Sequence, residues 1–85
     1  MKPVHIFSHA RFEMTRRGIS EAEVRATVAN PGQIVPGKNG RQIHQSLLPP
    51  HGHHLLRVVV KEERGAYSVL TAYKTSKVDK YWRQP

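Results

Sequence analysis

The chain has 85 residues, with 14 Lys and Arg against 6 Asp and Glu, and it contains no cysteine. This length predicts a single domain, residues 1–85, and the absence of cysteine excludes disulfide bonds and zinc sites with thiolate ligands. The formal net charge of +8 favours an anionic partner: a nucleic acid, an acidic protein segment or a membrane surface.

Two helices are predicted after a short N-terminal segment that forms either a strand or an arm. Ser8 is expected to cap the first helix, and Gly18 suits its C-terminal end because glycine readily adopts the left-handed conformation found there. Ser20 and Glu23 have the spacing of a capping box, which marks the start of the second helix. That helix should end at Asn30, since a residue before proline avoids the α conformation. Residues Ser8–Asn30 therefore predict a helical hairpin.

The rest of the chain predicts a sheet. The Asn39-Gly40 dipeptide indicates a turn between two short strands, and β-branched residues are frequent in 55–63 and 66–74. The tail predicts a short helical turn that Trp82 packs against the sheet. The expected fold class is α+β: an N-terminal helical hairpin packed on one face of a three- to four-stranded antiparallel sheet, with a short C-terminal helical turn.

Alternation along these strands separates the two faces of the sheet. Apolar residues such as Val58 and Leu70 are expected to face the hairpin. The uncovered face should then gather a polar set: His44, Ser46, Arg57, Lys61, Thr71 and Tyr73. Cations on such a face can hold phosphates and a tyrosine can stack on a base, which favours an RNA platform. The alternative is the ordinary polar surface that any one-sided antiparallel sheet presents to water.

Histidines are frequent in this chain. His9 falls in the first turn of the first helix, where the helix dipole favours the neutral imidazole, a proton acceptor. RNA cleavage by 2′-hydroxyl attack needs such a group, although a plain surface histidine is the competing interpretation. The run His51-Gly52-His53-His54 suggests a metal site, but a Gly- and Pro-rich loop without cysteine does not fix ligand geometry. We therefore predict no metal site and expect this loop to contact polyanions.

Several short motifs, taken in order, resemble a bacterial domain family of unknown function within the RelE/ParE-like toxin superfamily. They are His9-Ala10, Arg17-Gly18-Ile19-Ser20, Asn30-Pro31, Thr71-Ala72-Tyr73 and Lys80-Tyr81-Trp82. The resemblance spans about residues 6–82, and it rests on the order and spacing of the motifs rather than on any one of them.

The resemblance implies a fold similar to barnase, EndoU and colicin ribonucleases. It also implies metal-independent RNA cleavage that needs no cofactor and leaves a 2′,3′-cyclic phosphate. His9 would be a general acid or base, and Arg57 would bind the scissile phosphate. Thr71 and Tyr73 would position the phosphate or the 2′-hydroxyl group. The side chains expected to bind RNA around this site are His44, Lys61, Lys74 and Lys80.

The favoured function is a small basic ribonuclease, the toxin of a toxin–antitoxin pair, that acts on free or ribosome-bound RNA and is neutralised by an acidic antitoxin protein. One alternative is a non-catalytic RelE-like module that binds RNA, the ribosome or a partner protein. Another is a ParE-like inhibitor of a protein target such as gyrase. No apolar run approaches the roughly 18 residues of a membrane helix and no secretory leader is recognisable, so we expect a cytoplasmic protein without a membrane partner.

Overall fold

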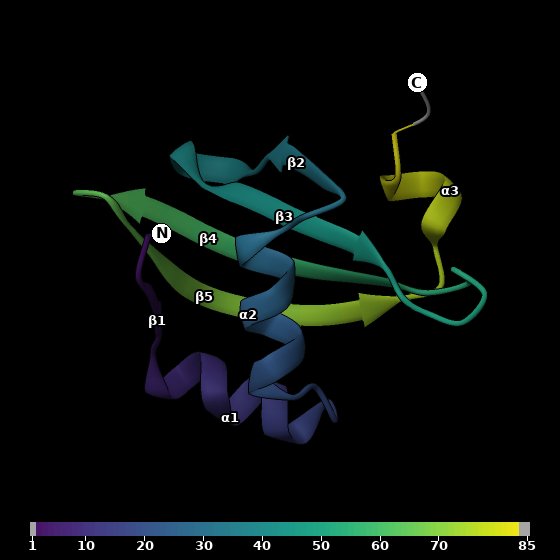
Figure 1. Ribbon diagram of the computed structural model, residues 1–85, viewed down its shortest axis with the longest axis horizontal. Helices are drawn as coiled ribbons and strands as arrows, with labels where there is room; N and C mark the ends of the chain where they lie inside the picture. The colour runs from purple at the N-terminus through teal and green to yellow at the C-terminus, as the bar shows by residue number, and fades with distance from the viewer. Residues whose placement is uncertain (1, 84–85) are drawn as a thin grey trace.

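A computed structural model describes residues 2–83, and its central feature is a five-stranded sheet (Figure 1). The elements in chain order are β1 (Val4–Ile6), α1 (Ser8–Arg16), α2 (Glu21–Ala29), β2 (Gln33–Pro36), the 3-10 turn η1 (Lys38–Gly40), β3 (Gln42–Leu47), β4 (Leu55–Glu63), β5 (Ala66–Thr75) and α3 (Val78–Tyr81).

The fold is α+β, but its sheet is mixed, so the predicted three- to four-stranded antiparallel sheet is wrong. The strand order is β1-β5-β4-β3-β2; β1 runs parallel to β5, and the other pairs are antiparallel. β1 has three residues, which pair from Val4 with Tyr67 to Ile6 with Val69. So short a strand carries no alternation pattern. It forms because the edge of β5 presents backbone groups that need hydrogen-bond partners.

The two N-terminal helices do not form the predicted hairpin, which is a second correction to the fold. α1 has its main contacts with β5, whereas α2 lies against β3 and β4. Figure 1 shows α2 crossing the sheet while α1 runs below β5. Gly18, with a φ of +67°, reverses the chain between them. Each helix is therefore held by the sheet rather than by the other helix.

The core lies between the sheet and these two helices. α1 contributes Ala10 and Met14, and α2 contributes Val24 and Val28. The strand residues that complete this core are Ile6, Leu56, Val58, Val60, Val69 and Ala72. Burial of this apolar set supplies most of the stability that two short helices and a small sheet lack when isolated.

A β-bulge in β5 reverses part of the predicted assignment of faces. Val59 pairs with Thr71 but Val60 pairs with Val69, so Leu70 is an extra residue on its strand. As a result Val69 is fully buried in the core, whereas Leu70, which was predicted there, is only half-buried.

α2 begins and ends as predicted. The Ser20 hydroxyl accepts a hydrogen bond from the backbone N–H of Glu23, and the Glu23 carboxylate accepts one from the N–H of Ser20, each at 3.0 Å. The helix ends at Ala29. The predicted Ser8 cap of α1 is wrong, because Ser8 is already the first helical residue and no side chain caps this helix.

Removing the capping box should destabilise the domain measurably. We expect Ser20→Ala to lower the free energy of unfolding by about 1 kcal/mol, because one helical N–H group loses its acceptor. In a domain of this size that corresponds to a fall in Tm of roughly 4–8 °C. Ser8→Ala is the matched control, since the Ser8 side chain makes no capping bond. Equal losses in the two variants, measured by urea or thermal unfolding, would contradict the prediction.

The C-terminal turn α3 packs on the face of the sheet opposite α1 and α2. The Tyr81 ring lies over Arg57, with 4.0 Å between the guanidinium carbon and the ring centroid. Trp82 lies so close to Gly32 that a Cβ atom there would meet its Cη2 atom at 2.8 Å. The predicted helical turn is thus confirmed, with Tyr81 packed on the sheet and Trp82 in contact with the chain just before β2. Nowhere in residues 2–83 is a helix long and apolar enough to cross a membrane.

Candidate functional site

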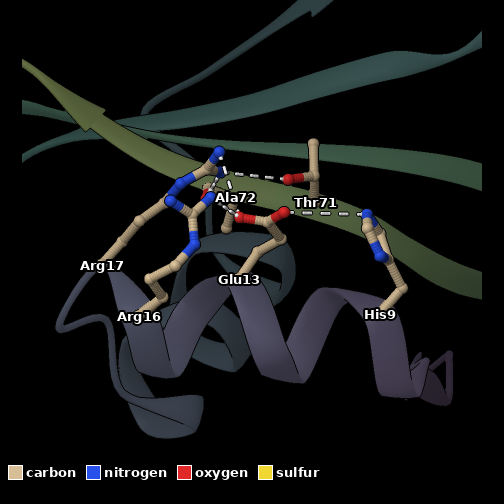
Figure 2. Close-up of polar contacts among 6 residues, drawn as sticks. All are labelled: His9, Glu13, Arg16, Arg17, Thr71 and Ala72. Carbon is tan, nitrogen blue, oxygen red and sulfur yellow. Dashed lines mark hydrogen bonds and ion pairs between the residues drawn. The ribbon is translucent and has the colours of Figure 1, made fainter.

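Polar side chains of α1 meet β5 along one edge of that strand (Figure 2). His9, Glu13 and Arg17 recur every four residues, so they share one face of α1. Arg16 lies beside them, and Thr71 of β5 lies opposite, within reach of Arg17. We refer to these five residues as the α1–β5 cluster.

Glu13 lies at the centre of the α1–β5 cluster. Its carboxylate accepts a hydrogen bond from Arg16, and it lies 3.2 Å from Nη2 of Arg17 and 3.9 Å from Nε2 of His9. The hydrogen bond from Arg16 and the positive charges of Arg16, Arg17 and His9 lower the pKa of Glu13, while burial acts in the opposite direction. The carboxylate therefore stays ionised at neutral pH and can stabilise a positive charge on the imidazole.

Arg17 is held in place by three acceptors. Its Nη1 atom donates to the Ala72 carbonyl at 2.9 Å and to the Thr71 hydroxyl at 3.3 Å, and its Nη2 atom pairs with Glu13. The Arg17 side chain is nevertheless 36% exposed and that of His9 is 76% exposed. A fixed guanidinium group and an exposed imidazole thus lie at one edge, an arrangement suited to acid–base chemistry on a phosphate ester.

A second polar group lies on the face of the sheet away from α1 and α2. Arg57 donates from Nε to Gln45 Oε1 at 2.9 Å and from Nη1 to the Tyr73 hydroxyl at 2.5 Å. Gln45 in turn donates to Gln33 Oε1 at 2.9 Å and to the Tyr81 carbonyl at 3.1 Å. We refer to these five residues as the Arg57 network. Because the Tyr81 ring covers it, Arg57 is only 6% exposed.

The predicted catalytic residues fall into two neighbouring pairs. His9 and Thr71 belong to the α1–β5 cluster, and Arg57 and Tyr73 belong to the Arg57 network. Thr71 and Tyr73 are two residues apart on β5 and share the face away from the core residue Ala72. The two groups are therefore adjacent on one strand, but Arg57 is buried whereas His9 and Arg17 are exposed.

The lysines predicted to bind RNA are dispersed. Lys61 is exposed on the same face as Arg57 and lies 2.8 Å from a carboxylate oxygen of Glu63. Lys74 lies on the opposite face, where its Nζ atom is 3.4 Å from Glu23. Lys80 is exposed on α3. No single surface holds all three lysines.

His44 lies on the helix side of the sheet, so its predicted place on the uncovered face is wrong. It pairs with the core residue Val58, and its Nδ1 atom donates to the Val28 carbonyl at 3.1 Å. Its exposed fraction is 1%. Ser46, two residues along, shares this side. Alternation along β3 would bury the apolar Ile43 instead, but a helix carbonyl within reach lets the polar His44 occupy the buried position.

Buried His44 should make the stability of the domain depend on pH. Burial lowers the pKa of His44 below its ordinary value of 6.5, although the hydrogen bond to Val28 opposes this. The folded state therefore favours the neutral imidazole, and the unfolded chain binds more protons as the pH falls below about 6.5. We expect the free energy of unfolding to fall between about pH 7 and pH 5, and to fall less steeply in His44→Gln.

Urea unfolding at several pH values measures this dependence. His5→Gln is the control, because His5 is an exposed histidine on β1. The same dependence on pH in the wild type and in His44→Gln would contradict the prediction.

Some residues of the α1–β5 cluster and of the Arg57 network were given no role by the sequence. The contact between Glu13 and Arg17 could have been predicted, since polar side chains four residues apart along a helix face one another. Gln33 and Gln45 had none, because they meet through the pairing of β2 with β3, which local sequence does not specify.

The histidine run lies in the loop between β3 and β4. The rings of His51 and His53 are 5.5 Å apart between centroids and tilted by 35°. Within residues 2–83, no three His, Cys, Asp or Glu side chains are placed to hold a metal ion. The loop presents imidazoles to solvent without gathering a set of metal ligands.

Comparison with known proteins gives one match. The model of a family described as a domain of unknown function (DUF4258) matches residues 6–74, well over half of the chain. No curated protein and no solved structure matches the chain. The resemblance to a domain family of unknown function is thereby confirmed, whereas its RelE/ParE-like part stays a prediction. The chain belongs to the DUF4258 family.

Proposed function

We propose that this domain is a small basic ribonuclease that cleaves RNA without a metal ion. In this reaction the 2′-hydroxyl oxygen attacks the adjacent phosphorus, the bond from phosphorus to the 5′-oxygen breaks, and a 2′,3′-cyclic phosphate is left. The steps need a proton acceptor, a proton donor and cationic groups around the phosphate. The α1–β5 cluster is the observation that carries the proposal, because an exposed imidazole, a carboxylate and two guanidinium groups converge there.

His9 would accept the proton of the attacking 2′-hydroxyl group. A neutral imidazole is the side chain best suited to accept a proton near physiological pH. The ionised carboxylate of Glu13, 3.9 Å from its Nε2 atom, would stabilise the imidazolium that forms. Water would protonate the departing 5′-oxygen, since the α1–β5 cluster holds a single imidazole.

Arg17 and Thr71 would hold the phosphate. Arg17 is fixed by its bonds to β5 and to Glu13 before any ligand arrives, so little reorganisation is needed when negative charge develops on the phosphate oxygens. The Thr71 hydroxyl, which already contacts Arg17, would position a phosphate oxygen or the 2′-hydroxyl group.

Unneutralised positive charge elsewhere on the molecule supports a polyanionic substrate. The exposed cationic side chains that form no ion pair within residues 2–83 are Lys38, Arg41, Arg64, Lys77, Lys80 and Arg83. Such a surface raises the local concentration of nucleic acid and binds it in a salt-dependent way.

We also propose that the domain is the toxin of a toxin–antitoxin pair. The motif resemblance to RelE/ParE-like toxins favours a cytoplasmic toxin that acts on free or ribosome-bound RNA. The basic surface would suit neutralisation by an acidic antitoxin protein. Lys61 and Lys80 would contribute long-range attraction rather than contacts in the α1–β5 cluster.

One observation favours a second candidate, a non-catalytic module that binds RNA, the ribosome or a partner protein. Arg57, the residue expected to bind the scissile phosphate, lies under Tyr81 and is almost completely buried. A binding module needs no residue that binds a scissile phosphate, and it would bind RNA without cleaving it.

Incubation of total RNA with the purified domain in EDTA separates the two candidates. We expect the wild type to shorten RNA and to leave 2′,3′-cyclic phosphate ends, which end-group analysis identifies. His9→Ala should lower the cleavage rate by about 100- to 10,000-fold, the usual contribution of a general base. His5→Ala is the matched control, since His5 is exposed on β1 and outside the α1–β5 cluster.

Two results would contradict the ribonuclease. RNA that stays intact while it binds the wild type would favour the binding module. Growth arrest on expression with intact RNA and an inhibited gyrase would favour the ParE-like alternative.

A further inference from the structure

Backbone hydrogen bonds join the two ends of the loop between β3 and β4, although its sequence is rich in Gly and Pro. The N–H of Leu48 donates to the His54 carbonyl at 2.9 Å, and the Leu48 carbonyl accepts from the N–H of Gly52 at 2.9 Å. The Leu48 side chain packs against the core. Gly52 takes a φ of +67°, which a glycine adopts without strain. We refer to residues 48–54 as the histidine loop.

An open cavity of about 470 Å³ lies between the histidine loop and Lys74 of β5. His51, His53 and His54 line it together with Lys74 and two prolines. All three histidines are exposed. The cavity therefore combines cationic or protonatable groups with flat ring surfaces, which is the chemistry that recognises a phosphate and an unstacked base.

The charged groups around this cavity favour an anion. Lys74 supplies a permanent positive charge, and Glu23 of α2 lies 3.4 Å from its Nζ atom. The three histidines add imidazole nitrogens that can donate hydrogen bonds to phosphate oxygens. The cavity thus presents one ammonium group and several imidazole donors beside a single carboxylate.

The position of Lys74 connects the cavity to the α1–β5 cluster. Lys74 follows two residues after Ala72, whose carbonyl accepts the hydrogen bond from Arg17. Two residues of a strand span roughly 7 Å. Arg17, Lys74 and the histidine loop therefore follow one another along the end of β5, so that one extended RNA strand can contact all three.

We propose that the histidine loop and Lys74 form a second RNA subsite, which holds a phosphate and its neighbouring base beside the α1–β5 cluster. The choice of RNA as the ligand rests on the proposed function. The subsite gives a role to the histidine run, which the proposed cleavage chemistry does not use.

Binding of an RNA oligonucleotide that is 2′-O-methylated at every nucleotide tests the subsite, because such a strand cannot be cleaved by 2′-hydroxyl attack. Fluorescence anisotropy in EDTA compares the wild type with the double variant His51→Gln/His53→Gln, and with His5→Gln as the control. We expect the double variant to bind about tenfold more weakly, the effect of losing the imidazole hydrogen bonds to one phosphate. His5→Gln should bind like the wild type.

The result that overturns the subsite is a double variant that binds RNA as tightly as the wild type and His5→Gln. This outcome is independent of the proposed function, which the cleavage assay decides separately. A wild type that cleaves RNA while the double variant binds normally keeps the ribonuclease and removes the subsite. A wild type that cleaves nothing while the double variant binds weakly removes the ribonuclease and keeps the subsite. Circular dichroism of each variant confirms that it is folded.

Discussion

Replacing Arg17 by alanine should lower the rate of RNA cleavage about 100- to 1,000-fold, the usual effect of removing one preorganised donor to developing charge. Arg17 is the guanidinium group of the α1–β5 cluster that contacts α1 and β5 at once, through Glu13, Thr71 and the Ala72 carbonyl. The loss should appear in kcat more than in KM, because the charge that Arg17 faces develops in the transition state. Single-turnover cleavage of a labelled RNA measures it.

The control for this prediction is another arginine with similar bonds. Arg25 on α2 donates to the Val4 carbonyl at 2.9 Å and lies 3.4 Å from Glu21, so Arg25→Ala removes the same kinds of contact elsewhere. We expect Arg25→Ala to cleave at the wild-type rate. Arg17→Lys should recover only part of the rate, because one ammonium group cannot bind β5 and two phosphate oxygens in the fixed geometry of a guanidinium group. Equal activity of Arg17→Ala and Arg25→Ala would remove Arg17 from the site.

The elements that the sequence predicts well are those determined by residues close in sequence. The capping box of Ser20 and Glu23 and the Asn30-Pro31 boundary fix α2 within a few residues. The positive φ values of Asn39 and Gly40 match the turn that this dipeptide indicates. Each of these features depends only on residues that are close together in the sequence, so it forms without help from a distant segment.

The errors arise where distant segments meet. β1 is a strand only because β5 lies beside it, and the hairpin fails because each helix finds more apolar surface on the sheet than on the other helix. Because of the bulge at Leu70, the residues before it on β5 lie on the face of the sheet opposite to the predicted one. His44 is in the core because the Val28 carbonyl is there to accept its hydrogen bond. None of these partners is near in sequence.

The candidate site shows the same division. The four-residue spacing of His9, Glu13 and Arg17 is local, and it places all three on one face of α1. The covering of Arg57 is not local: a tail more than twenty residues away folds back over the strand, and Tyr81 closes the face that alternation predicts to be bare. Alternation assigns a side chain to a face of a sheet, but it does not show what lies on that face.

The burial of Arg57 leads to the second large expected effect, which is on stability. Arg57 makes no ion pair with a carboxylate within residues 2–83, and its partners are Gln45, the Tyr73 hydroxyl and the Tyr81 ring. Arg57→Ala should lower the free energy of unfolding by about 3 kcal/mol, because Gln45 loses its donor and Tyr81 loses the cation beneath it. That is a large share of the roughly 5–15 kcal/mol that holds a domain of ordinary stability together. Urea unfolding measures the loss.

Two further variants show whether Arg57 acts through its shape or through its charge. Arg57→Met keeps most of the volume and removes a buried charge that lacks an anionic partner among the described residues, so we expect it to cost less than Arg57→Ala. Arg41→Ala, at an exposed arginine, should cost almost nothing. At temperatures where Arg57→Ala is folded, its cleavage rate should stay within about threefold of the wild type, because a residue 6% exposed under Tyr81 does not reach the substrate. A lost rate with unchanged stability would instead mean that Tyr81 moves aside and that Arg57, rather than Arg17, binds the scissile phosphate.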